Sequence, residues 1–164
     1  MLKYLDTAIG FQEIPNETTL CINVTGCPCQ CVGCHSPELS KDIGKDLTVH
    51  EILKLKCMYG DGITCICFMG GDANPSYINE MAKVVKDKDR PFKCAWYSGR
   101  QYISDEIDLV NFDFIKIGPY IESLGPLNNP NTNQRLYQID HVEGKPFIKD
   151  ITAKFWENGI NSFK

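Results

Sequence analysis

Four nearly continuous apolar runs constrain the fold of this chain more than any other feature of its sequence. They occupy residues 20–24, 63–68, 92–97 and 112–117. A strand covered on both faces is apolar throughout, whereas a strand with one solvated face alternates apolar and polar residues. The four runs therefore predict buried strands, of the kind found in parallel sheets that helices cover.

Segments with helical patterns separate these runs. One expected helix begins at Thr48, which can form a capping box with Glu51. Its apolar face would consist of Ile52, Leu53, Leu55 and Met58. A second expected helix begins at Pro75, a favoured first-turn residue. Its apolar face would consist of Ile78, Met81, Ala82 and Val85. A further helix is expected over residues 103–110, and the first 14 residues are expected to add a short hairpin or an edge strand.

Strands that alternate with helices predict an α/β fold with right-handed crossovers. A complete eight-fold barrel needs about 250 residues, and this chain has 164. We therefore expect one domain over residues 1–164, with the fold of a partial, open β/α barrel of mostly parallel strands. An open side would leave room for a macromolecular substrate.

The charge of the chain argues against some kinds of partner. The formal net charge is −4, so nothing indicates that the chain binds nucleic acid or a membrane surface. The opening residues, MLKYLDTAIG, lack the basic and apolar regions of a signal peptide. No apolar run approaches the roughly 20 residues that span a bilayer. We expect a cytoplasmic protein.

The chain has nine cysteines, an odd number that argues against a framework of disulfides. Those inside apolar runs or a helical pattern are interpreted as buried, small hydrophobic residues: Cys21, Cys57, Cys65, Cys67 and Cys94. The other cysteines crowd one short segment: Cys27, Cys29, Cys31 and Cys34. This second group is the candidate for chemistry.

Polar and glycine-rich segments follow each predicted strand, at residues 25–35, 70–74, 98–101 and 118–120. In α/β folds the ligand binds at the carboxyl ends of the strands. The four segments are therefore expected to converge on one rim.

The spacing of Cys27, Cys31 and Cys34, C-x3-C-x2-C, is suited to an iron–sulfur cluster, because thiolates are its usual ligands. Three cysteines leave one iron of a [4Fe-4S] cluster without a protein ligand. Two alternatives remain open. Cys29, Cys31, Cys34 and His35 could bind Zn²⁺ in a binding module without catalysis, and Cys31 with Cys34 could form a redox pair.

Three stretches of the chain resemble a known family: GCPCQCVGCHSPEL at residues 26–39, FMGGDANP at 68–75 and TNQRLY at 132–137. The cysteine motif resembles that of the radical S-adenosylmethionine superfamily. Together the stretches resemble the activating proteins of anaerobic (class III) ribonucleotide reductase, and the resemblance covers about residues 17–139.

The resemblance implies a [4Fe-4S] cluster on Cys27, Cys31 and Cys34 that cleaves S-adenosylmethionine (SAM) to a carbon radical. It implies SAM contacts from Val32, Gly33, Cys34, Gly70, Gly71, Asp72 and Ser98. Asp72 stands where many members have the longer glutamate, and would receive the methionine amino group. Gly33 stands where many members have an aromatic residue against the adenine. Cys29 is an additional thiol, either a bystander or an alternative ligand.

The resemblance also implies partners. The chain would generate a glycyl radical on the large subunit of the anaerobic ribonucleoside-triphosphate reductase, with electrons from a donor such as reduced flavodoxin. The alternatives are an activase of another glycyl-radical enzyme and a radical enzyme acting on a small molecule. Residues 128–134 are expected to form an exposed loop, and Asn133, Gln134 and Arg135 are candidates for contact with the partner or cofactor.

Overall fold

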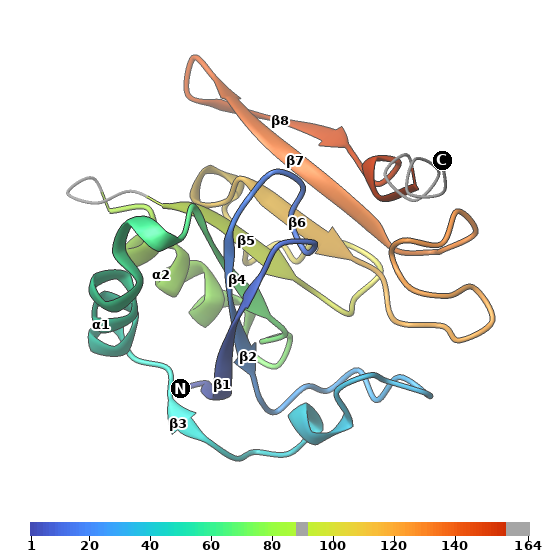
Figure 1. Cartoon of the computed structure of the whole chain (residues 1–164), viewed down its shortest axis with the longest axis horizontal. Coiled ribbons are helices and arrows are strands. Elements are labelled where there is room, and N and C mark those ends of the chain that lie inside the picture. The colour runs from blue at the N-terminus through green and yellow to red at the C-terminus, as the bar shows by residue number, and fades with distance from the viewer. Residues whose placement is uncertain (88–91, 157–164) are drawn as a thin grey trace.

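A computed structural model describes residues 1–87 and 92–156, and one open, eight-stranded sheet runs through it (Figure 1). The strands lie in the order β3-β1-β2-β4-β5-β6-β7-β8. Their bounds are β1 Lys3–Gly10, β2 Thr19–Val24, β3 Lys45–Asp46, β4 Cys65–Met69, β5 Lys93–Tyr97, β6 Phe114–Ile117, β7 Arg135–Val142 and β8 Lys145–Asp150.

The centre of the sheet confirms the four predicted strands. β2, β4, β5 and β6 pair in parallel, with Cys21 opposite Cys67 and Phe68 opposite Trp96. Each of these strands is almost entirely buried, as the continuous apolar runs require. Their carboxyl ends consequently meet at one edge of the molecule.

The prediction of a partial β/α barrel with mostly parallel strands is wrong. Four of the seven strand pairings are antiparallel, because β1 and β3 flank the parallel centre on one side and β7 and β8 on the other. A helix follows β2 and another follows β4, but no long helix joins β5 to β6. After β6 the chain turns back as an antiparallel strand, so the sheet is mixed and open.

The helices α1 (Val49–Tyr59) and α2 (Pro75–Val85) lie side by side and cover one face of the sheet (Figure 1). The Oγ1 of Thr48 accepts a hydrogen bond from the backbone N–H of Glu51, which confirms the predicted N-cap. The Glu51 carboxylate instead accepts a hydrogen bond from Tyr4. Leu53 and Met58 are exposed, so the predicted apolar face of α1 is partly wrong.

The helix predicted over residues 103–110 does not form. The segment contains turns, and a 3₁₀ turn at Leu109–Asn111 ends it. Ser104 and Asp108 each accept a hydrogen bond from the backbone N–H two residues ahead, at 3.3 and 3.2 Å. Such bonds stabilise turns at the expense of helix.

A second, smaller core covers the opposite face of the sheet. It contains Ile14, Cys65, Cys67, Ala95, Phe114, Leu127, Leu136 and Ile151. These residues come from strands, from the β1–β2 connection and from the segments after β6 and β8. This face is therefore closed by loops, and it carries the cavity described below.

The hairpin of β7 and β8 was not expected from the sequence. The polar segment expected to be an exposed loop leads directly into β7, and Thr132 and Gln134 within it are buried. β8 is exposed along its whole length, so its sequence has no pattern of buried apolar residues that would indicate a strand. In the described part of the chain, no helix has the length and apolar character to cross a membrane.

Candidate functional site

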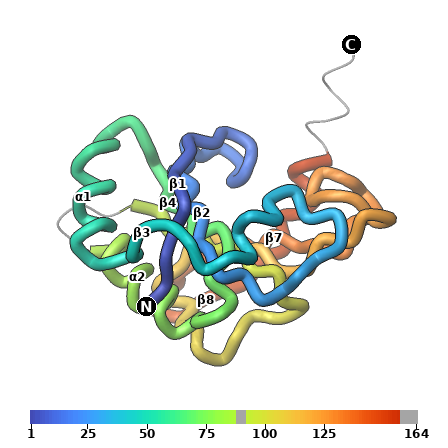
Figure 2. Tube along the Cα trace, turned by 90° about the horizontal axis from the view of Figure 1, so that it is seen from below, coloured from blue at the N-terminus to red at the C-terminus, as the bar shows by residue number. Residues whose placement is uncertain are grey.

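The cysteine loop connects β2 to a 3₁₀ turn at Pro37–Ser40. The backbone N–H of Gly26 donates to the carbonyl of Lys41, and that of Cys27 donates to the carbonyl of Leu39. These bonds fix both ends of the loop against each other. Figure 2 shows this segment beside the segment that follows β6.

A tight turn presents the last two cysteines of the motif. The backbone N–H of Cys34 donates to the carbonyl of Cys31 at 3.2 Å, and Gly33 between them has a φ of 72°. A four-residue turn with positive φ at its third position favours glycine. The backbone therefore explains why an aromatic residue is absent here. Val32 is 84% exposed and points away from the protein.

Asp72 is the buried carboxylate of the site, with only 1% of its surface exposed. Its Oδ1 accepts a hydrogen bond from Ser98 at 2.5 Å, and its Oδ2 accepts one from the backbone N–H of Gly99 at 2.9 Å. Arg100 donates to the Asp72 carbonyl and places its Nε 3.8 Å from the carboxylate. The segment after β5 thus holds the acid that follows β4.

Ser98 was expected to contact the cofactor. Its hydroxyl donates to Asp72 and accepts a hydrogen bond from the backbone N–H of Arg100 at 3.0 Å. Its single donor is therefore used inside the protein. Within this structure Ser98 orients the carboxylate of Asp72.

Lys116 is the charged residue at the floor of the site, on β6. Its ammonium donates to the carbonyl of Gly118 at 2.8 Å and lies 5.8 Å from the centre of the Tyr97 ring. Burial lowers the pKa of Lys116 to about 8, although nearby Asp72 and Cys31 favour the charged form. The sequence held a signal for this residue, since it is a lysine inside an apolar run.

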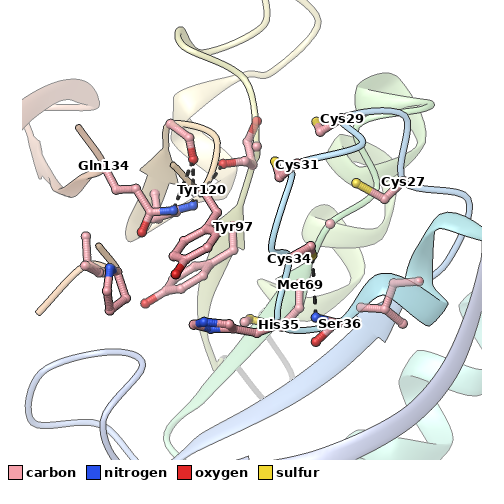
Figure 3. A pocket seen from close by; sticks show the side chains of 18 of the residues that line it. Cys27, Cys29, Cys31, Cys34, His35, Ser36, Met69, Tyr97, Tyr120 and Gln134 are labelled. Atoms are coloured by element: carbon pink, nitrogen blue, oxygen red, sulfur yellow. Dashed lines mark hydrogen bonds between the residues drawn. The ribbon is translucent and has the colours of Figure 1, made fainter. Parts of the chain in front are cut away.

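A cavity of about 760 Å³ joins these groups at the carboxyl ends of the parallel strands (Figure 3). Its volume falls within the range of about 300–1,000 Å³ that is usual for ligand sites. The predicted site residues that line it are Cys27, Cys31, Cys34, Gly70, Asp72, Ser98 and Gln134. Val32, Gly33, Gly71, Asn133 and Arg135 are not among the lining residues. The four polar segments that follow the parallel strands all contribute to this cavity.

Two lining residues were not expected from the sequence. Gln12 and Glu13 reach the cavity from the β1–β2 connection, where Tyr97 donates a hydrogen bond to the carbonyl of Glu13. No local motif marks Gln12 and Glu13, because distant parts of the chain bring them to the cavity. His35, from the zinc set considered from sequence, also lines the cavity, and its ring lies 4.7 Å from that of Tyr120, centre to centre.

Cys29 also lines the cavity, and it faces Asp72. Its Sγ lies 3.7 Å from Oδ2 of the carboxylate. Burial raises the pKa of the Cys29 thiol to about 12, and the charge of Asp72 adds to the shift. Among the described residues, Cys27, Cys29 and Asp72 are the group whose ligand atoms all lie within 4.8 Å of one another. The zinc set considered from sequence, which included His35, is not gathered in this way.

Comparisons of the chain with models of protein families, with curated proteins and with solved structures found no match.

Proposed function

We propose that this chain is a radical SAM activating enzyme, which generates a glycyl radical on an anaerobic ribonucleoside-triphosphate reductase. One observation carries the proposal. The three cysteines of the C-x3-C-x2-C motif and the buried carboxylate of Asp72 line the same cavity, although they follow different strands. A ligand there can contact a metal centre on the loop and the acid at the same time.

The residues present fit a cluster with one iron left open. Thiolates are the ligands that iron–sulfur clusters use, and Cys27, Cys31 and Cys34 are free thiols that are at least partly accessible. A cluster bound there, with SAM on its open iron, would supply an electron to break a carbon–sulfur bond of SAM. The protein would anchor, orient and shield the reactants.

The polar groups of the cavity suit an amino-acid ligand. The Asp72 carboxylate is already oriented by Ser98 and Gly99, and would accept the ammonium group of methionine. The ammonium of Lys116 lies on the opposite, β6 side and would favour a carboxylate. We propose a cytoplasmic location, with reduced flavodoxin or a similar donor supplying the electron.

The first test is the cluster itself. Iron and labile sulfide in anaerobically reconstituted protein should approach a [4Fe-4S] content, and Cys27→Ala, Cys31→Ala or Cys34→Ala should abolish cleavage of SAM because each removes one of three anchors. Cys29→Ala is the matched control in the same loop and should retain cleavage. A dead Cys29→Ala beside an active Cys27→Ala would show that different cysteines hold the cluster.

The second test identifies the partner. Reduced enzyme with SAM should produce a glycyl radical on the reductase subunit from the same cell, detected by electron paramagnetic resonance with the target glycine isotopically labelled. SAM cleavage without this radical would favour another glycyl-radical enzyme or a small-molecule substrate. A protein that binds Zn²⁺ but never a cluster would favour the binding module instead.

A further inference from the structure

Cys29 lies outside the three-cysteine motif, yet the fold places it against a buried acid. Its Sγ is 3.7 Å from Oδ2 of Asp72, and the Sγ of Cys27 completes a group within 4.8 Å. The acid is 43 residues away in sequence, so the contact depends on the pairing of β2 with β4. Figure 3 shows Cys29 and Cys27 at the same end of the loop.

Two thiolates and one carboxylate form a ligand set that suits Zn²⁺. Zinc takes sulfur at about 2.3 Å and carboxylate oxygen at about 2.0–2.2 Å, in tetrahedral geometry. Two such ligands on one ion stand roughly 3.5 Å apart, close to the 3.7 Å between Cys29 and Asp72. A single ion requires closely gathered ligands, whereas a cubane spreads its ligands over separate irons.

The carboxylate is also supported as a metal ligand usually is. Metal-binding groups are held by hydrogen bonds from surrounding residues, and these partners affect affinity about 10–100-fold. Asp72 is buried and accepts hydrogen bonds from Ser98 and the backbone N–H of Gly99. The carboxylate of Asp72 is therefore already held in one orientation before an ion binds.

We propose that Cys27, Cys29 and Asp72 form a mononuclear Zn²⁺ site with one open coordination position. Occupying it would release the thiol protons of both cysteines. The site has a consequence that rests on the proposed function: Cys27 is also a cluster ligand and Asp72 also a cofactor contact. A chain that holds Zn²⁺ here cannot complete the cluster, so zinc would keep the enzyme inactive.

Co²⁺ is the probe for this site, because tetrahedral thiolate–cobalt coordination gives characteristic near-ultraviolet and visible absorption. Metal-free protein is titrated anaerobically with Co²⁺, and Zn²⁺ is then added in competition. Cys29→Ala should weaken Co²⁺ binding at least about tenfold and reduce the thiolate absorption. Cys34→Ala, which removes a cluster ligand outside this group, should leave the affinity unchanged.

Gly99→Ala tests the geometry without removing a ligand. A Cβ at Gly99 would lie 2.7 Å from the Sγ of Cys29 and 3.7 Å from Oδ2 of Asp72, so it should displace the thiol and weaken Co²⁺ binding. Gly62→Ala is the control, since a Cβ there meets nothing within 4 Å. Equal Co²⁺ affinity in wild type and Cys29→Ala, or an equal loss in Cys34→Ala, would overturn the proposal.

A separate measurement distinguishes failure of this site from failure of the proposed function. Wild-type protein loaded with Zn²⁺ should assemble the cluster more slowly than metal-free protein, and Cys29→Ala should remove that difference. If the cluster forms but Cys29→Ala does not change Co²⁺ affinity, the zinc site is wrong and the proposed function is retained. If Co²⁺ binding depends on Cys29 but the protein never assembles a cluster, the zinc site is retained and the proposed function is wrong.

Discussion

At the scale of single residues, the cavity depends on side-chain contacts that cannot be predicted from the sequence. Lys116 was visible as a charge inside an apolar run, but its partners, the carbonyl of Gly118 and the ring of Tyr97, follow from the packing of β5 against β6. For Gly71, the Gly-Gly pair with Gly70 already indicated a turn. The structure adds that its φ is 94°.

Gly71→Ala should destabilise the protein by about 2–4 kcal/mol. A non-glycine residue at positive φ costs about 1–3 kcal/mol, and the added Cβ would lie 2.5 Å from Cδ1 of Ile78 in α2. Denaturant unfolding measures the loss. Gly62→Ala, with open space around its Cβ, should change the free energy of unfolding by less than about 0.5 kcal/mol.

Lys116→Met should flatten the rise of stability at alkaline pH. The pKa of Lys116 is about 8 in the folded protein against 10.5 when unperturbed. The unfolded chain therefore binds the extra proton between these values, and stability increases as pH rises from about 8 to 10.5. Across this pH range, the deprotonation of Lys116 should raise the free energy of unfolding by about 3 kcal/mol. Lys145→Met, on the exposed strand β8, controls for the lost charge. Equal slopes in all three proteins would contradict the argument.

At the scale of elements, the sequence predicted what hydrophobic periodicity records. The four buried strands and α2 were recognisable because each presents a long apolar pattern. β7 and β8 were not, since β8 is exposed and β7 has only Leu136 and Ile139 buried among its apolar positions. The direction of the chain after β6 was equally hidden, because neither composition nor spacing distinguishes a returning strand from another crossover.

Leu136→Ala tests whether β7 is part of the core. Leu136 is fully buried in the second core, so its truncation should cost about 2–5 kcal/mol. Val142→Ala lies on the same strand at 54% exposure and should cost far less. Denaturant unfolding measures both changes. If Leu136→Ala lowers the free energy of unfolding no more than Val142→Ala does, the hairpin contributes little to the stability of the sheet.

At the scale of the whole molecule, the cavity is closed by segments from both ends of the described chain. Gln12 and Glu13 reach it from the β1–β2 connection, while Gln134 and Phe155 reach it from the segments around β7 and β8. The expected convergence of strand ends was predictable from general rules for parallel strands. The contribution of the flanking antiparallel strands was not predictable in this way, because it depends on the mixed sheet and the sequence pattern favoured parallel strands.

Under the proposed function, SAM binding in this cavity should raise the stability of the folded chain as a whole. A ligand at 100 times its dissociation constant adds about 2.7 kcal/mol to the free energy of unfolding. A thermal melt of the cluster-loaded protein with and without SAM measures the shift. Asp72→Asn keeps the shape of the side chain and removes its charge, so most of the shift should disappear. A full shift in this variant would show that Asp72 does not receive the ligand.

The distance along the chain between ligands determines the order in which metals can be captured. Cys27 and Cys34 are seven positions apart, so the proposed cluster ligands are neighbours as soon as this segment leaves the ribosome. Asp72 meets Cys29 only across 43 residues, after β2 and β4 have paired. The nascent chain would thus offer the proposed cluster site before the proposed zinc site exists. In refolding experiments with Zn²⁺ present throughout, a larger fraction of the protein should carry the cluster when iron and sulfide are added before refolding than when they are added afterwards.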